Sequence, residues 1–180
     1  MAARLPYDRK GILIYLLRNV QTKNKLEIIK KSESCMGKLA LILERELVEV
    51  ALNDKDWGLL RFIGRNHGVQ SSEGLKHTRN GLLCLSQILK SHNIELRYWA
   101  KEVAHLLLNT VNAFKGSEDI DQIEVICDIL DAALTGLSFV VRTFSRELRD
   151  ELTGQRSPYC AFLKELLEFN VEGMMSYAGE

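Results

Sequence analysis

One long stretch with an uninterrupted heptad pattern constrains the fold of this chain more than any other feature. Between residues 117 and 152, apolar side chains recur at alternating spacings of three and four residues. They are Ile120, Ile123, Cys127, Leu130, Leu134, Leu137, Val141, Phe144 and Leu148. This spacing predicts one continuous α-helix, about 54 Å long at about 1.5 Å per residue.

The apolar stripe of this helix is wider than a simple heptad requires. Ile126, Ala133 and Val140 occupy positions where a two-stranded coiled coil normally carries charges. The width favours a helix that packs against several others, as the spine of a bundle. We expect Gly136 to be the place where so long a helix bends.

The heptad pattern does not say whether the chain's own helices bury the whole apolar stripe. In one reading it is the central core helix of a monomer. In the other, the face formed by Ile123, Leu130, Leu137 and Phe144 is partly covered by a partner protein or a second copy, because a helix of about 54 Å is longer than a typical small domain.

The remainder of the chain also reads as helical. Only 2 prolines occur in 180 residues, and a stretch so poor in proline suits continuous helices. Apolar periodicity and capping residues predict further helices at about 8–20, 34–52, 55–66, 73–91, 95–114 and 157–170. The predicted fold class is therefore all-α: one domain, a bundle of about seven helices around a central helix at 117–152.

A weak internal repeat adds to this prediction. The runs Leu82–Cys84 and Val125–Cys127 lie 43 residues apart, and each opens an apolar helical segment. This spacing is similar to the period of armadillo and HEAT repeats, although the similarity covers only these short runs. It implies that pairs of helices stack on one another.

Charge is balanced overall but separated along the chain. The net charge is zero, yet residues 1–31 hold eight Lys or Arg against two acids, and residues 115–180 hold six against thirteen. A basic segment can serve as an arm for an anionic partner. Alternatively, the two ends attract each other, within one chain or between copies, and overall neutrality favours this second interpretation.

Cysteine usage and hydropathy bear on the compartment. The four cysteines, at positions 35, 84, 127 and 160, are widely spaced and form no CxxC motif. They read as reduced thiols that pack as small apolar side chains, which favours a reducing compartment and a cytoplasmic location. No segment approaches the roughly 20 apolar residues that cross a bilayer, so we expect no membrane partner.

Motifs that carry catalysis or bind cofactors and metals are missing from the sequence. The acids Glu118, Asp119, Asp121 and Glu124 are explained by their place at a helix N-terminus, where negative charge is favourable. We therefore expect a protein that is not an enzyme and that needs no cofactor or metal. An active site assembled in space from His, Cys or paired carboxylates stays open as an alternative.

One set of basic residues could form a nucleic-acid or anion surface. Trp57, Arg61 and Arg65 are spaced by four, so they fall on one helical face. An aromatic ring beside arginines can stack on bases while the charges meet phosphates. The candidate surface comprises Arg9, Lys10, Trp57, Arg61, Arg65, Lys76 and Arg79. In the competing interpretation, Trp57 packs in the core and the arginines pair with acids of the C-terminal half.

The leading functional hypothesis is a non-enzymatic helical protein that binds other proteins as an adaptor or scaffold. Self-association is part of this hypothesis, through the long helix or through contacts between the basic and acidic ends. The alternative hypothesis is an RNA- or DNA-binding helical protein that uses the basic arm and residues 57–79. Its binding would depend strongly on salt, because phosphate contacts release counterions.

Overall fold

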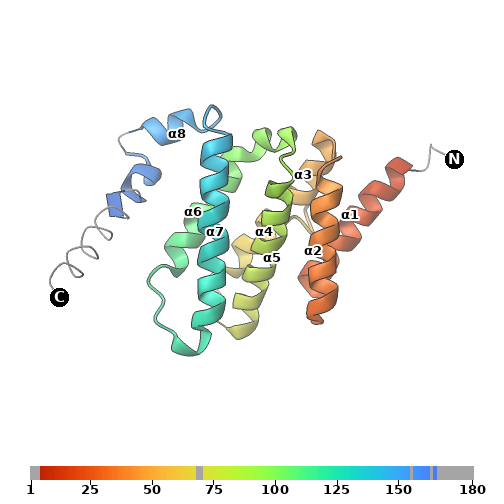
Figure 1. The fold of residues 1–180 in the computed structure, drawn as a ribbon, viewed down its shortest axis with the longest axis horizontal. Helices are drawn as coiled ribbons and strands as arrows, with labels where there is room; N and C mark the ends of the chain where they lie inside the picture. Colours follow the sequence, from red (N-terminus) through yellow and green to blue (C-terminus); the bar gives the residue numbers. More distant parts are fainter. Residues whose placement is uncertain (1–4, 68–70, 155, 163, 166–180) are drawn as a thin grey trace.

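The computed structural model describes residues 5–67, 71–154, 156–162 and 164–165, and within these ranges the regular structure is entirely helical. Figure 1 shows the arrangement of the helices. In chain order they are α1 (Leu5–Thr22), α2 (Leu26–Ala40), α3 (Arg45–Asn53), α4 (Leu59–Asn66), α5 (Ser72–Lys90), the 3₁₀ helix η2 (Ile94–Trp99), α6 (Ala100–Phe114), the 3₁₀ turn η3 (Ile120–Gln122), α7 (Ile123–Thr143) and α8 (Arg149–Thr153). The predicted all-α bundle is confirmed.

The helices form two layers. In the layer nearest the viewer of Figure 1, called the front layer, α2, α5 and α7 lie side by side, and α1, α3, α4 and α6 form the back layer. Each front helix packs closely on a back helix, as α1–α2, α4–α5 and α6–α7. Stacking of helix pairs, which the internal spacing implied, is therefore what the chain adopts. Helix α1 lies at one end of the stack, and α7 and α8 lie toward the other (Figure 1).

Close contacts between the layers depend on two glycines. A Cβ atom at Gly81 in α5 would lie 2.8 Å from Cγ1 of Ile63 in α4. A Cβ atom at Gly136 in α7 would lie 3.1 Å from Cδ1 of Leu107 in α6. Both glycines are buried inside uninterrupted helices, where they allow the neighbouring helices to approach closely. Helix α7 runs through Gly136 to Thr143, so the chain does not break at this position.

The predicted continuous helix at 117–152 is also wrong, because the chain divides it into η3, α7 and α8. Helix α7 ends at Thr143, and Phe144, at φ −115° and ψ 37°, leaves the helical conformation. Phe144 and Leu148 are nonetheless buried, because the turn between α7 and α8 folds them back into the core. A straight helix would carry these apolar side chains past the end of the bundle.

Three other predicted helix boundaries change for local reasons. The predicted helix at 34–52 divides at Leu41–Glu44, where the side-chain amide of Asn93 donates to the carbonyls of Ala40 (2.7 Å) and Leu43 (2.8 Å). The predicted helix at 55–66 begins only at Leu59. The predicted helix at 95–114 opens as the 3₁₀ helix η2. Of the predicted helix at 157–170, residues 158–162 and 164–165 are helical and residues 166–170 lie outside the described residues.

Candidate interaction surfaces

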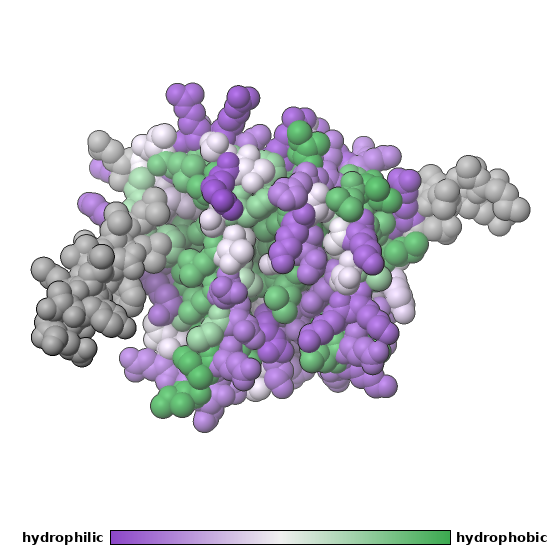
Figure 2. Space-filling view, viewed as in Figure 1, coloured by the Kyte–Doolittle hydropathy of each residue, from purple (hydrophilic) through white to green (hydrophobic). Residues whose placement is uncertain are grey.

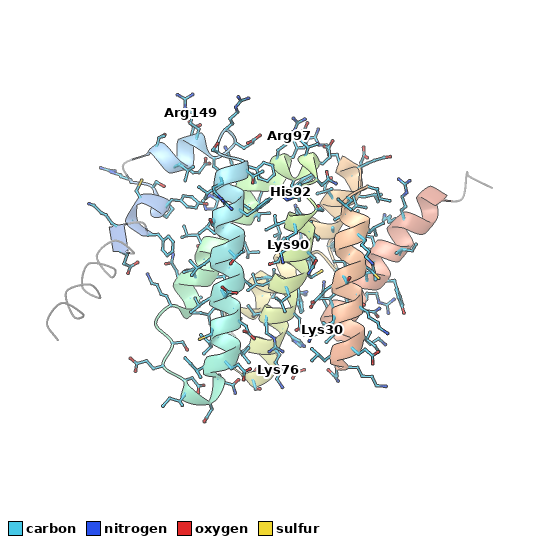
Figure 3. The ribbon with its side chains drawn as sticks, viewed as in Figure 1. Lys30, Lys76, Lys90, His92, Arg97 and Arg149 are labelled. Atoms are coloured by element: carbon cyan, nitrogen blue, oxygen red, sulfur yellow. The ribbon has the colours of Figure 1, made fainter. Side chains whose placement is uncertain are left out.

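A groove of about 420 Å³ runs along the front layer between α2, α5 and α7. We call it the polar groove. Helix α2 forms one rim, α7 forms the other, and α5 forms the floor. Its lining residues are Leu26, Lys30, Glu33, Arg79, Asn80, Leu83, Ser86, Gln87, Lys90, Asp128, Asp131, Ala132 and Thr135. In Figure 3, the labels of Lys30 and Lys90 mark the α2 and α5 sides of this valley.

Helix α5 presents a mixed stripe to the groove because of its residue spacing. Asn80, Leu83, Gln87 and Lys90 recur at intervals of three and four, which places them on one helical face. The opposite face carries the core side chains Leu75, Leu82, Leu85 and Leu89, all buried. The amphipathicity of α5 therefore anchors the helix and lines the groove with amide groups.

Glu33 is the unusual member of the groove. Its side chain is only 7% exposed, and the described residues give its Oε1 atom no hydrogen-bond partner. Burial raises the pKa of this carboxyl group to about 7, although the nearby charges of Lys30 and Arg79 act in the opposite direction. A buried polar atom without a partner costs about 1–3 kcal/mol.

Glu33 also has a signature in the sequence, although it is absent from the set of residues predicted above. In α2 the buried apolar residues Ile29, Met36 and Ala40 form one stripe. Glu33 lies on the same stripe, four residues after Ile29, where an apolar side chain is expected. A carboxylate on the buried face of an amphipathic helix is the feature that points to this site.

The charges around the groove nearly cancel, although the Glu33 carboxyl is only partly ionised at neutral pH. Lys30, Arg79 and Lys90 face Glu33, Asp128 and Asp131, and Nη1 of Arg79 lies 3.8 Å from Oδ2 of Asp128. The groove thus offers neither a polyanion nor a polycation a strong attraction. It suits a ligand that is neutral and rich in hydrogen-bonding groups.

The predicted nucleic-acid surface is distributed over both layers. Arg61 and Arg65 are exposed on α4 in the back layer, whereas Lys76 and Arg79 belong to α5 in the front layer. Arg79 pairs with Asp128, an acid of the C-terminal half, as the competing interpretation expected. These four residues therefore come from two helices that belong to different layers.

The other three residues of the predicted set lie toward the α1 end. Arg9 reaches Glu44 at 4.0 Å, and Lys10 is exposed. The half-buried Trp57 packs against the core, and the guanidinium of Arg18 lies 5.4 Å from its ring centroid. The ring of Trp57 is thus already used inside the chain and does not present a free face beside Arg61 and Arg65.

The predicted partner-helix face is divided between core and surface. Leu137 and Phe144 are buried within the chain, whereas Ile123 is 47% exposed and Leu130 is half-buried. The cause is the orientation of α7, which turns Ile126, Ala133 and Val140 into the core. The a/d stripe consequently lies along the edge of α7 and is only partly covered.

Two apolar hollows, which we call the end groove, follow this uncovered edge. They measure about 280 Å³ and about 450 Å³, and Leu134 and Phe162 line both. Leu130, Val111 and Val141 contribute the other main apolar walls. At the rim, Nζ of Lys115 donates to Oε2 of Glu165 over 2.6 Å. Figure 2 shows hydrophobic side chains gathering over α7, whereas hydrophilic ones dominate the lower part of α2.

We also searched the described residues for metal sites, reactive side chains and membrane-spanning helices. Within it, no group of three or more His, Cys, Asp or Glu side chains is placed to hold a metal ion. His67 is engaged structurally, since its Nε2 lies 2.7 Å from the hydroxyl of Thr110. None of the helices described is both long enough and apolar enough to span a membrane.

Comparison with known proteins adds no assignment to these surfaces. No protein-family model, no curated protein and no solved structure matches this chain.

Proposed function

We propose that this chain is a non-enzymatic helical interaction protein that binds a peptide segment of a partner protein in the polar groove. The observation that carries the proposal is the carboxyl group of Glu33, only 7% exposed and without a partner for Oε1 among the described residues, in the lining of an open groove. A structural role alone would leave that buried atom uncompensated.

The lining of the groove supports a peptide main chain as the ligand. A side-chain amide both donates and accepts, as a peptide group does, and Asn80 and Gln87 supply two such amides on the groove floor. Their separation along α5 is about 10 Å, which corresponds to about three residues of extended chain. Leu26 and Leu83, exposed at 52% and 37%, offer apolar contacts for the side chains of the peptide.

The proposal is tested by selecting peptides from a random display library on the purified full chain. Peptides of about twelve residues reach about 40 Å when extended. The enriched peptide is then synthesised with a fluorescent label and titrated by anisotropy. We expect Leu83→Arg to weaken binding at least about tenfold, because it fills the groove, and Gln87→Ala to weaken it about threefold to tenfold.

Matched controls separate the groove from general effects. Asn109→Ala changes an exposed amide residue on the back-layer helix α6, and Ile94→Arg changes an apolar residue, 65% exposed, outside the groove. Both should bind the peptide like the wild type. The proposal fails if no peptide is enriched, or if the enriched peptide binds Leu83→Arg and Gln87→Ala as tightly as it binds the wild type.

Nucleic-acid binding is the second candidate function, with a different set of residues from the one predicted. Figure 3 labels six basic residues from different elements, Lys30 of α2, Lys76 and Lys90 of α5, His92 after α5, Arg97 of η2 and Arg149 of α8. Five of them are lysines or arginines, which can neutralise phosphates. Two of the five, Lys30 and Lys90, lie in the polar groove beside Asp128 and Asp131, so phosphate contacts there compete with these acids. Anisotropy of a labelled single-stranded RNA, measured at about 50 and about 300 mM salt, tests this function. Binding should weaken steeply with salt and be lost in the Lys30→Glu, Lys90→Glu double variant.

We also propose a cytoplasmic location. All four cysteines are free, and Cys35 and Cys127 are exposed, which suits a reducing compartment. Fractionation of cells that express the tagged chain tests the location, and recovery in a secreted or membrane fraction would contradict it.

A further inference from the structure

We infer that copies of this chain associate head to tail, with the outer surface of α1 in one copy packing against the end groove beside α7 in the next. This contact involves the two ends of the helical stack and not the polar groove, so it stands independently of peptide binding there.

The head is the exposed side of α1. Ile12 and Tyr15 are 49% and 62% exposed, although they belong to a helix whose opposite side, with Leu13 and Leu17, is buried. Lys10 and Arg18 are exposed close to them in the sequence of the helix. The head is therefore an apolar strip on a helix that also carries the exposed basic side chains of Lys10 and Arg18.

The tail is the end groove together with the start of α7. Leu134 is 39% exposed between the two apolar hollows. At the N-terminal side of α7, Ile120 and Ile123 are 84% and 47% exposed. Four acids at or near the surface accompany them, Glu118, Asp119, Asp121 and Glu124. The tail is therefore an apolar strip with negative charge at the start of α7, while Lys115, Arg142 and Glu165 are the charged residues that line the end groove itself.

Within one chain the two surfaces cannot satisfy each other, since α1 and the end groove lie at opposite ends of the molecule (Figure 1). The ion pairs of the described residues also show no contact between the two ends. Arg9 of the basic segment pairs with Glu44, and the C-terminal acids Asp128, Glu151 and Glu165 pair with Arg79, Lys101 and Lys115. None of these pairs joins the basic segment (residues 1–31) to the acidic one (residues 115–180). The two segments are therefore available for ion pairs with a second copy.

The stacking itself explains why a second copy fits. In a layered array each helix pair covers the apolar side of its neighbour, so the first and last pairs keep an uncovered side unless a polar cap protects them. Among the described residues, both ends keep exposed apolar side chains, with basic side chains on α1 at one end and acidic ones at the start of α7 at the other. A contact between unlike surfaces is heterologous, so it continues from copy to copy and does not stop at a dimer.

Analytical ultracentrifugation of the full chain over a range of protein concentration tests the inference. At low salt we expect a concentration-dependent series of species beyond the dimer. Added salt should shift this series toward the monomer, since screening weakens contacts between exposed charges. Tyr15→Glu should disable the head, and Leu134→Arg should disable the tail. Both positions are surface-exposed, so neither change should prevent folding. Ile94→Arg, an exposed apolar position at neither end, should associate like the wild type.

Mixing the two variants gives the decisive result. Each variant alone should be monomeric, but the Tyr15→Glu chain keeps a tail and the Leu134→Arg chain keeps a head. An equimolar mixture should therefore form dimers that grow no further. Three results would overturn the inference: a wild type that stays monomeric at low salt, a wild type that stops at a symmetric dimer, or a mixture that remains monomeric.

Discussion

The buried carboxyl group of Glu33 links the stability of the fold to pH. Glu33 lies on the apolar stripe of α2, next to the fully buried Cys84. Burial raises the pKa of the Cys84 thiol, and the Glu33 carboxylate adds to this rise. The raised pKa of Glu33 itself is caused by burial. Glu33 should therefore make the stability of the fold depend on pH near neutrality.

We predict that Glu33→Gln stabilises the protein, and more so at about pH 8 than at about pH 5. The carboxyl pKa is about 7 in the folded chain against 4.5 as an ordinary value, so between these pH values the folded state binds more protons than the unfolded state. Wild-type stability must fall as pH rises through this window, by on the order of 3 kcal/mol. Urea unfolding at both pH values measures the difference.

The control for this prediction is Glu27→Gln, which changes an exposed glutamate of the same helix. Its free energy of unfolding should change little, and by nearly the same amount at both pH values. If the wild type and Glu33→Gln show parallel pH dependences, the proton uptake assigned to Glu33 is absent.

His67 should act in the opposite direction. Burial lowers the pKa of this imidazole below 6.5, and the hydroxyl of Thr110 donates to the Leu106 carbonyl, which leaves its oxygen to accept from Nε2–H of His67. As pH falls below 6.5 the unfolded chain takes up a proton that the folded chain refuses, so stability is lost. An NMR titration of His67 should give a midpoint below 6.5. A midpoint at or above 6.5 would contradict the assignment.

At the scale of helices, α4 and α5 approach each other closely at Gly81, so we predict that a larger residue there lowers the stability of the fold. In Gly81→Ala the new methyl group would meet Cγ1 of Ile63 at 2.8 Å and the ring of Phe62 at 3.1 Å. Overpacking of this kind costs about 1–3 kcal/mol, more than the gain in helix propensity, so the variant should be less stable. Thermal and urea unfolding measure the change.

Gly11→Ala is the matched control, because Gly11 also lies within a helix but a Cβ there has nothing within 4 Å. This variant should gain about 0.5–1 kcal/mol from helix propensity alone. Equal effects at the two glycines would mean that α4 and α5 do not approach each other at Gly81 as closely as described.

The sequence predicted some of the helices accurately and missed one break between them. Apolar periodicity located α5 almost to the residue, with Ser71 as the cap whose Oγ accepts from the N–H of Gly74. The apolar positions Ile126, Ala133 and Val140 correctly indicated that α7 faces several helices. The break at Phe144 was missed, because both a continuing helix and a turn back into the core require apolar residues at Phe144 and Leu148.

Surface assignments were harder to predict for a related reason. Spacing within one helix places residues on a face but does not say which layer that helix joins, so Arg61 and Lys76 were grouped although their helices belong to different layers. The predicted partner face is divided between core and surface because a rotation of α7 about its own axis decides which side of a broad stripe is buried. Leu134, at the uncovered edge, was recognisable as apolar but not as exposed.

At the scale of the whole molecule, association and stability are linked. A contact that forms only between folded copies stabilises the folded state by mass action. If copies pack head to tail, the melting temperature of the wild type should rise with protein concentration, and the rise should be smaller at high salt, where charges are screened. Leu134→Arg should instead melt at one temperature throughout. Calorimetric scans over about a hundredfold range of concentration measure this, and a gain of about 2.7 kcal/mol corresponds to a hundredfold excess over Kd. A wild-type melting temperature that does not change with concentration would mean that the end groove is covered within each copy.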